Sequence, residues 1–437
     1  MQPARQRRQR RPAGLLEPWF APFALVNGAA VGVTPILLPV VAARHGLGHV
    51  GIVMGAFNLG AFAAPLIGSL ADQRHAYRAL ATACAAVTAV SLWLFPLAGN
   101  ALQVLLALGD GAGFAGAVTI ANLLVVERHP RAEWNQRLGW LETALSVGQG
   151  GALFLSAWLS GLSPKDGLLI GALVPAAAIP LALLLIPRMP AGRPARPEPA
   201  SPGPGHHLAS IGHVGEWGPA SPSRVHRAWR WPRRRLTGVT GLLRGGLGWM
   251  LAAWLPAYAG SAIIFSLYPV LFRQAFGIAT ATSALAFAVI VFASLPLFVL
   301  AGRASQRFGP APVIAAAYIG RIILLTALAA FAAAGHVPQV LPLAAFAGIM
   351  FAWSFLSVAS PGLAGQLRPD AEGDAQGLLN ACSGLAGLLG SVTGGVAADL
   401  WGYPAALAIG AGATAAGLAI FAATLLRRRP APAGVPG

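Results

Sequence analysis

The chain has 437 residues, of which 56% are hydrophobic and only 10% are charged, and its mean hydropathy is +0.66. This balance lies far from that of a soluble domain and places the chain in a membrane. The net charge of +17 falls in tails and in short connections between apolar runs, so we expect no nucleic-acid partner.

The N-terminal tail is basic and precedes the first apolar run. By the positive-inside rule, this tail lies in the cytoplasm. The run that starts near Glu17 is too long for the core of a signal peptide and lacks a convincing cleavage site, so we expect a retained first helix. The basic residues of the tail are Arg5, Arg7, Arg8, Arg10 and Arg11.

Apolar runs of about 20 residues, the length of a membrane-spanning helix, recur along nearly the whole chain. We predict an all-α polytopic membrane protein with twelve transmembrane helices in two pseudo-symmetric six-helix bundles, residues 17–187 and 246–426, with both termini cytoplasmic. Only Arg44, Lys165 and Arg273 fall on the outer side in this topology. The predicted spans are 17–43, 49–71, 78–98, 101–126, 137–161, 166–187, 247–272, 279–302, 311–334, 338–365, 374–398 and 403–426.

Residues 188–245 are rich in Pro, Gly, Ser, His and Arg, with too few apolar residues to build a core, and are predicted to be a disordered basic cytoplasmic linker. Its last part, residues 224–236, interleaves Trp229 and Trp231 with arginines. This composition suits an anionic membrane surface, although a solvated topology signal is the favoured reading. Residues 1–16 and 427–437 are the cytoplasmic tails.

Two short polar stretches suggest duplicated halves. GSLADQRHAY at 68–77 has a weaker copy, GRASQRFG, at 302–309, and each is predicted to be a tight turn at a membrane face. Gly68 and Gly302 are 234 residues apart. Pro35 matches Pro269 at the same offset, whereas Pro130, Gly148 and Gly151 match Pro369, Gly387 and Gly390 at an offset of 239.

The two halves, the long linker and the turn between spans two and three together resemble the major facilitator superfamily of secondary transporters. In the turn, Gly68, Asp72, Arg74 and Arg78 fit the family's signature, while Gln73 and His75 depart from it. In the second copy Gly302, Arg307 and Gly309 fit, and Gln306 replaces the aspartate. Residues 387–402 are similar to the family's eleventh helix, with Gly390, Gly394 and Gly395 expected to allow close helix approach. The resemblance implies that Gly68, Asp72, Arg74, Gly302, Arg307 and Gly309 gate an alternating-access cycle.

The resemblance also implies that helices 1, 4, 7 and 10 surround a central cavity. Aromatic and hydroxyl residues recur at helical spacing in these spans, and such a lining would suit an apolar or amphipathic organic molecule. Each stripe taken alone is more often packing than binding. The predicted cavity residues are Asn27, Thr34, Asp110, Trp254, Tyr258, Ser261, Tyr268, Trp353 and Ser357, with Phe20, Phe23, Phe265 and Ser360 on the same stripes.

Two acids, Asp110 and Glu142, fall well inside predicted spans and are the candidate proton carriers, because burial favours the protonated form of a carboxyl group. Asp110 is preferred, since its helix is expected to line the cavity. Glu142 lies little more than a turn from Arg137 and has an ion pair at the cytoplasmic rim as its alternative role. Arg321 is assigned to snorkelling or helix pairing on a peripheral helix and is left out of the site.

We therefore predict a secondary active transporter of a small organic molecule, with proton-coupled efflux as the favoured direction. Uptake of a metabolite or lipid, or a non-transporting sensor or scaffold whose linker binds a partner, are the alternatives. The arginine of helix four and the glycine-proline pair of helix five that drug and proton antiporters usually carry are missing here.

The expected partners are the small-molecule substrate, a proton and membrane lipids, and we expect a monomer. No cluster has catalytic or metal-ligand spacing, so neither an enzyme nor a metal or other cofactor is expected. Cys84 and Cys382 are predicted to be packing residues.

Overall fold

The computed structural model describes residues 17–129, 133–188, 245–368 and 372–426. The two tails and residues 189–244, which include the predicted surface segment 224–236, lie outside the described residues. Almost all described residues are helical. In the N-terminal half the helices are α1 Phe20–Gly28, η1 Ala29–Val33, α2 Thr34–Ala42, η2 Ala43–His45, α3 Leu47–Gly60, η3 Ala61–Ala63, α4 Ala64–Arg74, α5 Tyr77–Leu94, η4 Phe95–Leu97, α6 Asn100–Arg128, α7 Trp134–Leu159, α8 Pro164–Gly171 and α9 Leu173–Leu185.

The C-terminal half has fewer and longer helices. The longest one, α16, contains one non-helical residue, Gly402, with φ 83° and ψ 171°. Because only glycine adopts such a positive φ without strain, the chain reverses there between two spans. The helices of this half are α12 Gly246–Phe276, α13 Thr280–Phe308, α14 Pro310–Ala334, α15 Val340–Leu367, α16 Glu372–Phe421 and η8 Ala422–Leu426.

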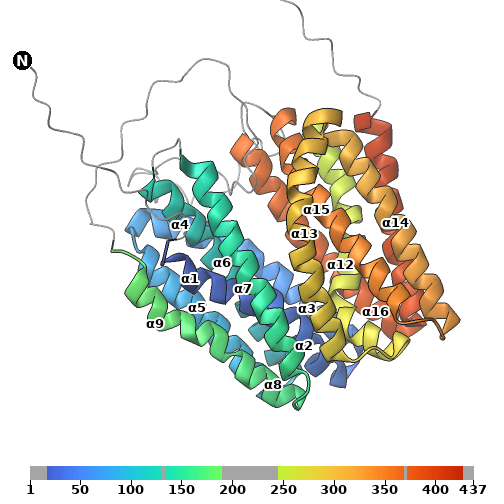
Figure 1. Ribbon diagram of the computed structural model, residues 1–437, viewed down its shortest axis with the longest axis horizontal. Helices are drawn as coiled ribbons and strands as arrows, with labels where there is room; N and C mark the ends of the chain where they lie inside the picture. The colour runs from blue at the N-terminus through green and yellow to red at the C-terminus, as the bar shows by residue number, and fades with distance from the viewer. Residues whose placement is uncertain (1–16, 130–132, 189–244, 369–371, 427–437) are drawn as a thin grey trace, which may run out of the picture.

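Ten described segments are long and apolar enough to cross a membrane on their own. One of the ten, Ala375–Leu426, is divided by Gly402 into two spans, and α7 supplies another span that is more polar than the rest. The described residues therefore form the predicted twelve spans. The blue to green helices of the N-terminal half gather on one side of the molecule and the yellow to red helices of the C-terminal half on the other (Figure 1).

The spans alternate in direction, so the molecule has two ends. We call the end where α1 begins and α6 ends the terminal face, and the end where α3 and α13 begin the far face. By this alternation Glu17 before α1, Arg188 after α9 and Leu426 at the end of η8 all lie at the terminal face.

The stretch 68–77 is mostly helix and only partly a turn. Helix α4 continues to Arg74, and α5 begins at Tyr77. His75 between them has φ 48°, the only positive φ of a non-glycine residue among those described. The reversal is therefore shorter than predicted, because one left-handed residue suffices to end a helix. In the second copy, α13 likewise runs to Phe308 before Gly309 turns the chain with φ 84°.

The glycines of the internal repeat have different partners from those the sequence match suggests. Gly148 of α7 packs against the backbone of Ala24 in α1, and Gly390 of α16 packs against the backbone of Ala259 in α12. Gly151, which the sequence pairs with Gly390, has open space beside its Cα. Gly148 is thus the structural equivalent of Gly390, about one helical turn from the predicted register.

Glu17 joins three helix ends at the terminal face. Its carboxylate lies 3.2 Å from Nη1 of Arg137, 2.8 Å from Nε2 of His129 and 3.9 Å from Nη2 of Arg128. The indole of Trp19 donates to the same carboxylate at 2.6 Å. Because the Arg137 side chain is only 8% exposed, this carboxylate neutralises a largely buried cation.

Replacing Glu17 with glutamine is expected to lower the free energy of unfolding of the N-terminal half by about 1–3 kcal/mol, since a buried charged group loses part of its compensation. The measurement is the melting temperature of the purified protein followed by tryptophan fluorescence. Glu127→Gln is the matched control, because Glu127 is exposed at the same end of α6. Equal melting temperatures for the two variants would contradict the structural role of Glu17.

Candidate functional site

The two halves meet through glycines near the far face. A methyl group at Gly51 of α3 would lie 2.9 Å from the Cα of Gly395 in α16, and one at Gly55 would lie 3.0 Å from Leu388. Nδ2 of Asn58 reaches Oγ of Ser391 at 3.4 Å across the same contact. Small residues allow the two backbones to approach this closely. The predicted close approach of Gly390, Gly394 and Gly395 is confirmed, with Gly390 and Gly394 packing against α12.

A carboxylate from one half caps a helix of the other half. Oδ1 of Asp399 accepts a hydrogen bond from the backbone N–H of Leu47, the first residue of α3, at 3.2 Å. Negative charge at a helix N-terminus is favourable because the unpaired N–H groups carry a partial positive charge. Asp399 therefore adds a polar contact to the glycine contact at the far face.

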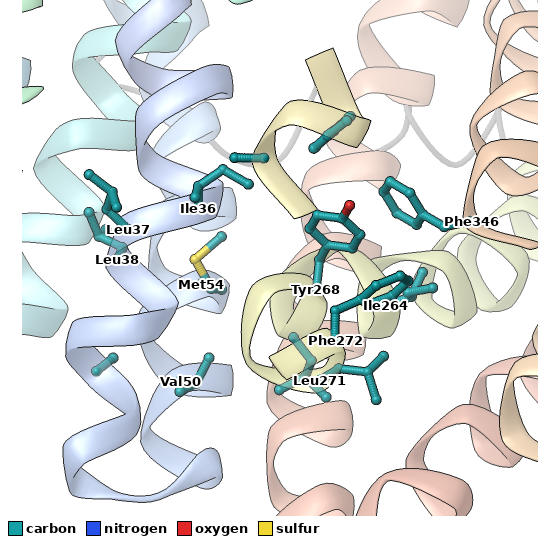
Figure 2. Close-up of a cluster of buried hydrophobic side chains, with 14 of the residues drawn as sticks. Ile36, Leu37, Leu38, Val50, Met54, Ile264, Tyr268, Leu271, Phe272 and Phe346 are labelled. Carbon is teal, nitrogen blue, oxygen red and sulfur yellow. The ribbon is translucent and has the colours of Figure 1, made fainter. Parts of the chain in front are cut away.

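The hydrophobic core is shared between the halves only toward the far face. One cluster joins Ile36 and Met54 of the N-terminal half to Ile264 and Leu271 of the C-terminal half, and Figure 2 shows Ile36 and Met54 pointing toward the helix that carries Tyr268 and Leu271. Toward the terminal face there are two separate clusters, one formed within each half. The halves are thus packed together at one end and independently packed at the other.

Helix α3 packs closely on α16 near the far face, but α4, which continues α3 toward the terminal face, does not. The face of α3 that packs on α16 continues past Phe62, which lies against Gly384, to Ser69 of α4. The matching face of α16 continues to Asn380 and Gly377. Ser69, Asn380 and Gly377 are all exposed. The molecule is therefore closed at the far face and open at the terminal face.

Asp110 forms a polar site inside the N-terminal half. Its side chain is fully buried, and its Oδ2 accepts a hydrogen bond from Thr34 Oγ1 at 2.7 Å. Thr88 of α5 lies close enough to interact with the carboxyl, but its hydroxyl and Asp110 Oδ1 have no well-formed hydrogen bond to described residues. Asp110 and Thr34, which were predicted independently for the cavity, are thus partners.

Asn27 points toward α7 and not toward Asp110, although it was predicted to share a helix face with Thr34. Its Nδ2 donates to the carbonyl of Leu145 in α7 at 2.8 Å, whereas Thr34 faces α6. The cause is η1, a π-helical turn between the two residues that inserts an extra residue and rotates the following helix. Phe20 and Phe23 are buried in the core of the N-terminal half.

Glu142 is exposed on α7 and lies on the opposite side of that helix from the exposed lipid-side residues Gly151 and Trp158. Gln149 shares its side of the helix and donates to the carbonyl of Val31 in η1 at 3.5 Å. The structure therefore directs Glu142 toward the interior of the molecule. Arg137, its suggested partner, is paired with Glu17 and Glu133.

Four predicted residues of the C-terminal half come together around aromatic rings. The Tyr258 ring lies 5.7 Å from that of Trp254 and 5.6 Å from that of Trp353. Trp254 donates its indole N–H to Ser383 Oγ at 2.8 Å. Ser261, one turn farther along α12, donates to the carbonyl of Ala257 at 3.2 Å. Tyr258 and Trp353 are half-buried, so part of each ring is exposed at the surface of this cluster.

Arg321 completes the same cluster, although sequence reasoning set it aside. Its Nη1 donates to Ser261 Oγ at 2.5 Å, and its guanidinium carbon lies 5.5 Å from the centre of the Trp353 ring. The side chain is 1% exposed, so it does not snorkel toward the membrane surface. The usable signal was a lone charge within an apolar span, which is a functional candidate by default.

The hydroxyl groups of the other two predicted cavity residues of this half, Tyr268 and Ser357, form hydrogen bonds outside the cluster. Tyr268 stacks on Phe346 with ring centres 4.0 Å apart and donates its hydroxyl to the carbonyl of Ser283 at 2.8 Å, within the shared core (Figure 2). Ser357 donates to the carbonyl of Ser354 on its own helix at 3.1 Å. Both hydroxyls are therefore already used within the protein.

The predicted gating residues sit at helix ends on the terminal face. Gly68 is buried, and a methyl group there would lie 3.0 Å from Thr119 of α6. Arg74 is exposed, and the side chain of Asp72 lies outside the described residues. In the second copy Gly302 has open space beside it, and Arg307 is exposed and lies over the ring of Phe308 at 5.2 Å.

A surface groove of about 420 Å³ lies between α13 and α15 near the far face. Its lining is apolar and includes the exposed side chains of Leu285, Val289 and Val340. It contains none of the predicted site residues and faces the lipid side of the helices.

The fold and these sites define a polytopic helical membrane protein whose two halves meet at one face and separate at the other. The chain matches the model of the Major Facilitator Superfamily over residues 20–262 and 255–437. It therefore belongs to the major facilitator superfamily, a family of transporters. A search of curated protein sequences gave no match.

Solved structures of similar fold include transporters of different substrates. The nucleoside transporter NupG is 13% identical with a TM-score of 0.69, covering 94% of this chain and 98% of its own. A bacterial homologue of the human lysosomal transporter Spinster, inward-facing and occupied, is 14% identical with a TM-score of 0.67, covering 95% and 98%. A D-xylose–proton symporter is 16% identical with a TM-score of 0.64, covering 92% and 95%.

Proposed function

We propose that this protein is a secondary active transporter that moves a small organic molecule by alternating access. The observation that carries the proposal is the shared core at the far face combined with separate cores at the terminal face. Two rigid halves with this contact pattern can rock about a midplane site, so that each face opens in turn. By the positive-inside rule we assign the terminal face, where the basic tails and linker begin and end, to the cytoplasm, and the structure to an inward-open state.

The chemistry around Tyr258 supports an amphipathic substrate with an apolar or aromatic body. Three aromatic rings contact one another here, and serine hydroxyls lie beside them. Flat rings pack well against apolar substrate groups, while hydroxyls fix their orientation. Trp254, Tyr258, Ser261 and Trp353 are proposed to bind substrate, with Asn27, Thr34, Tyr268 and Ser357 supporting the helices that hold them.

Asp110 is the proposed proton carrier, and export in exchange for protons is the proposed direction. The carboxyl is buried with a single described hydrogen bond, from Thr34, and has a free oxygen. A carboxyl group in such surroundings favours its protonated form and releases the proton when water reaches it. Glu142, exposed toward the interior, is proposed as a second group that passes protons from the terminal face.

The helix ends at 68–77 and 302–309 are the proposed gate of the terminal face. Gly68 packs tightly on α6, whereas Gly302 packs on nothing nearby. Asp72 carries a charge that Gln306 lacks. We therefore assign most of the charge-based latch to Gly68, Asp72 and Arg74, with Gly302, Arg307 and Gly309 providing the weaker copy.

The test is transport of a substrate panel in proteoliposomes with an imposed pH gradient. Asp110→Asn is expected to abolish gradient-driven accumulation while exchange of labelled for unlabelled substrate continues, because asparagine keeps the shape but cannot release a proton. Asp166→Asn, the same change at an exposed acid of α8, is the control and should behave as the native chain.

Unchanged gradient-driven transport in both Asp110→Asn and Glu142→Gln would remove the coupling proposal. Accumulation in the same direction as proton flow would replace export by uptake. Absence of transport and of exchange for every compound in the panel would count against a transporter.

A further inference from the structure

Arg321 is a buried cation with unused hydrogen-bond donors. It lies eleven residues from the start of α14, which places it about 17 Å from the terminal face, near the middle of the membrane. Nη1 is bonded to Ser261, but Nε and Nη2 have no hydrogen-bond partner among the described residues. Guanidinium N–H groups are almost always satisfied when buried, so these two donors require an explanation.

The membrane-spanning part of the C-terminal half does not provide a counter-ion. Residues 246–368 contain no aspartate or glutamate, and neither do residues 375–398 or 400–426. The one acid between the last two ranges, Asp399, lies at the far face and caps α3. In the other half Asp110 is fully buried and bonded to Thr34, and the described groups that act electrostatically on Arg321 are the phenols of Tyr258 and Tyr318 rather than Glu142. An unpaired cation inside a membrane protein is costly and marks a functional site by default.

The free donors have the geometry that a carboxylate needs. Nε–H and Nη2–H lie on the same edge of the planar guanidinium and point in the same direction, so both oxygens of one carboxylate can accept from them in parallel. The group on the opposite side, Nη1, is held by Ser261, whose own hydroxyl proton goes to the carbonyl of Ala257. Ser261 thus holds the guanidinium through Nη1 and leaves the Nε–Nη2 edge available to a carboxylate.

The buried guanidinium of Arg321 is surrounded by aromatic side chains. Trp353 lies 5.5 Å from the guanidinium carbon, and the phenols of Tyr258 and Tyr318 are close enough to interact with its charge. Tyr258 and Trp353 are half-buried and form the accessible side of the cluster. A single positive charge among aromatic rings matches a singly charged anion with an apolar body.

We propose that Arg321, held by Ser261, binds the carboxylate of an amphipathic organic acid, with Tyr258 and Trp353 contacting its apolar body. This assigns a substrate class to the proposed transport site, and it rests on the proposed function only in calling that ligand a substrate. Inorganic anions and anionic lipid head groups share the charge but differ in size and source. The experiment separates the three.

The experiment measures equilibrium binding to the full-length protein in phosphatidylcholine nanodiscs by isothermal titration calorimetry. The probes are 1-naphthoate and its neutral analogue 1-naphthamide, with inorganic phosphate as the small anion. The native protein is expected to bind naphthoate about tenfold or more tightly than naphthamide, a difference of one well-placed charged hydrogen-bond pair. Phosphate is expected to bind weakly, because it has no apolar body to contact Tyr258 and Trp353.

Arg321→Gln should bind both naphthalene probes equally, while Arg321→Lys should keep part of the preference. Arg273→Gln, which removes an exposed arginine in the last turn of α12, is the matched control and should bind as the native chain. Without ligand, Arg321→Gln is expected to melt at the same or a higher temperature, since it removes an uncompensated buried charge. Naphthoate should raise the melting temperature of the native protein but not of this variant.

Equal binding of naphthoate and naphthamide by the native protein would overturn the proposal, as would a preference that survives in Arg321→Gln. A melting temperature of Arg321→Gln far below that of the native protein would show that the arginine has a structural role instead. If nanodiscs with phosphatidylglycerol stabilise the native protein but not Arg321→Gln, and naphthoate does not bind, the site belongs to a lipid. Because no gradient is used, the result is independent of whether transport is proton-coupled.

Discussion

Gly51→Ala is expected to hold the far face open and to slow transport by about tenfold or more. Each 1.4 kcal/mol by which a substitution destabilises the closed far face lowers the population of that state about tenfold. The added methyl group would meet the Cα of Gly395 at 2.9 Å and clash with the carbonyl of Ser391. Both are backbone atoms, which cannot turn away as a side chain does. Overpacking of this kind costs about 1–3 kcal/mol, and separating the halves at the far face relieves it.

The measurement is the distance between spin labels at His45 and Trp401, which are both exposed at the far face. In the native protein the distribution should contain a short component that Gly51→Ala reduces. Gly151→Ala is the matched control, because the space beside Gly151 is open and alanine stabilises a helix by up to about 1 kcal/mol relative to glycine. The same distance distribution in Gly51→Ala and in the native protein would show that this contact does not control the far face.

Hydropathy and charge were sufficient to predict the fold. A membrane-spanning helix must be long and apolar, and basic residues gather in the connections on the cytoplasmic side. The twelve spans agree with the described helices, and the glycines of α16 pack as expected. Two local predictions were wrong: where the helix that contains Gly68 ends, and how the glycines of the two repeats align. The chain from Gly68 to Arg74 remains helical, since polar residues at a membrane face do not by themselves end a helix. The repeat was misaligned by about a turn because glycines recur in both spans.

The site was harder to predict, because it depends on which way each helix face points. The π-helical turn η1 separates Asn27 from Thr34, and no residue in the sequence AAVGV announces it. Arg321 was excluded because its helix is peripheral, yet arginine is long enough to reach Ser261 on α12 from there. A peripheral helix can therefore contribute to a central site when its side chain is long. Asp110 and Thr34 were each predicted, but only the fold reveals that they are bonded to each other.

A cross-link between Ser69→Cys and Gly377→Cys is expected to trap the terminal face closed and to abolish transport. Helices α3 and α16 run antiparallel, and their contacts proceed in steps of about one turn from Gly51 and Gly395 to Phe62 and Gly384. Continued toward the terminal face, this register places Ser69 opposite Gly377, although both are exposed in the present state. Closure of the terminal face by rocking of the halves should therefore bring these two positions together.

The pair is placed in a background in which Cys84 and Cys382, the two cysteines of the chain, are alanine. After oxidation, loss of free thiols should coincide with loss of transport, and a reductant should restore both. Labels at His45 and Trp401 should move apart at the same time, because alternating access allows only one face to be closed firmly. Ser69→Cys with Gly412→Cys is the control pair and should not cross-link. A cross-linked protein that still transports, or one whose far face stays closed, would contradict the rocking of two rigid halves.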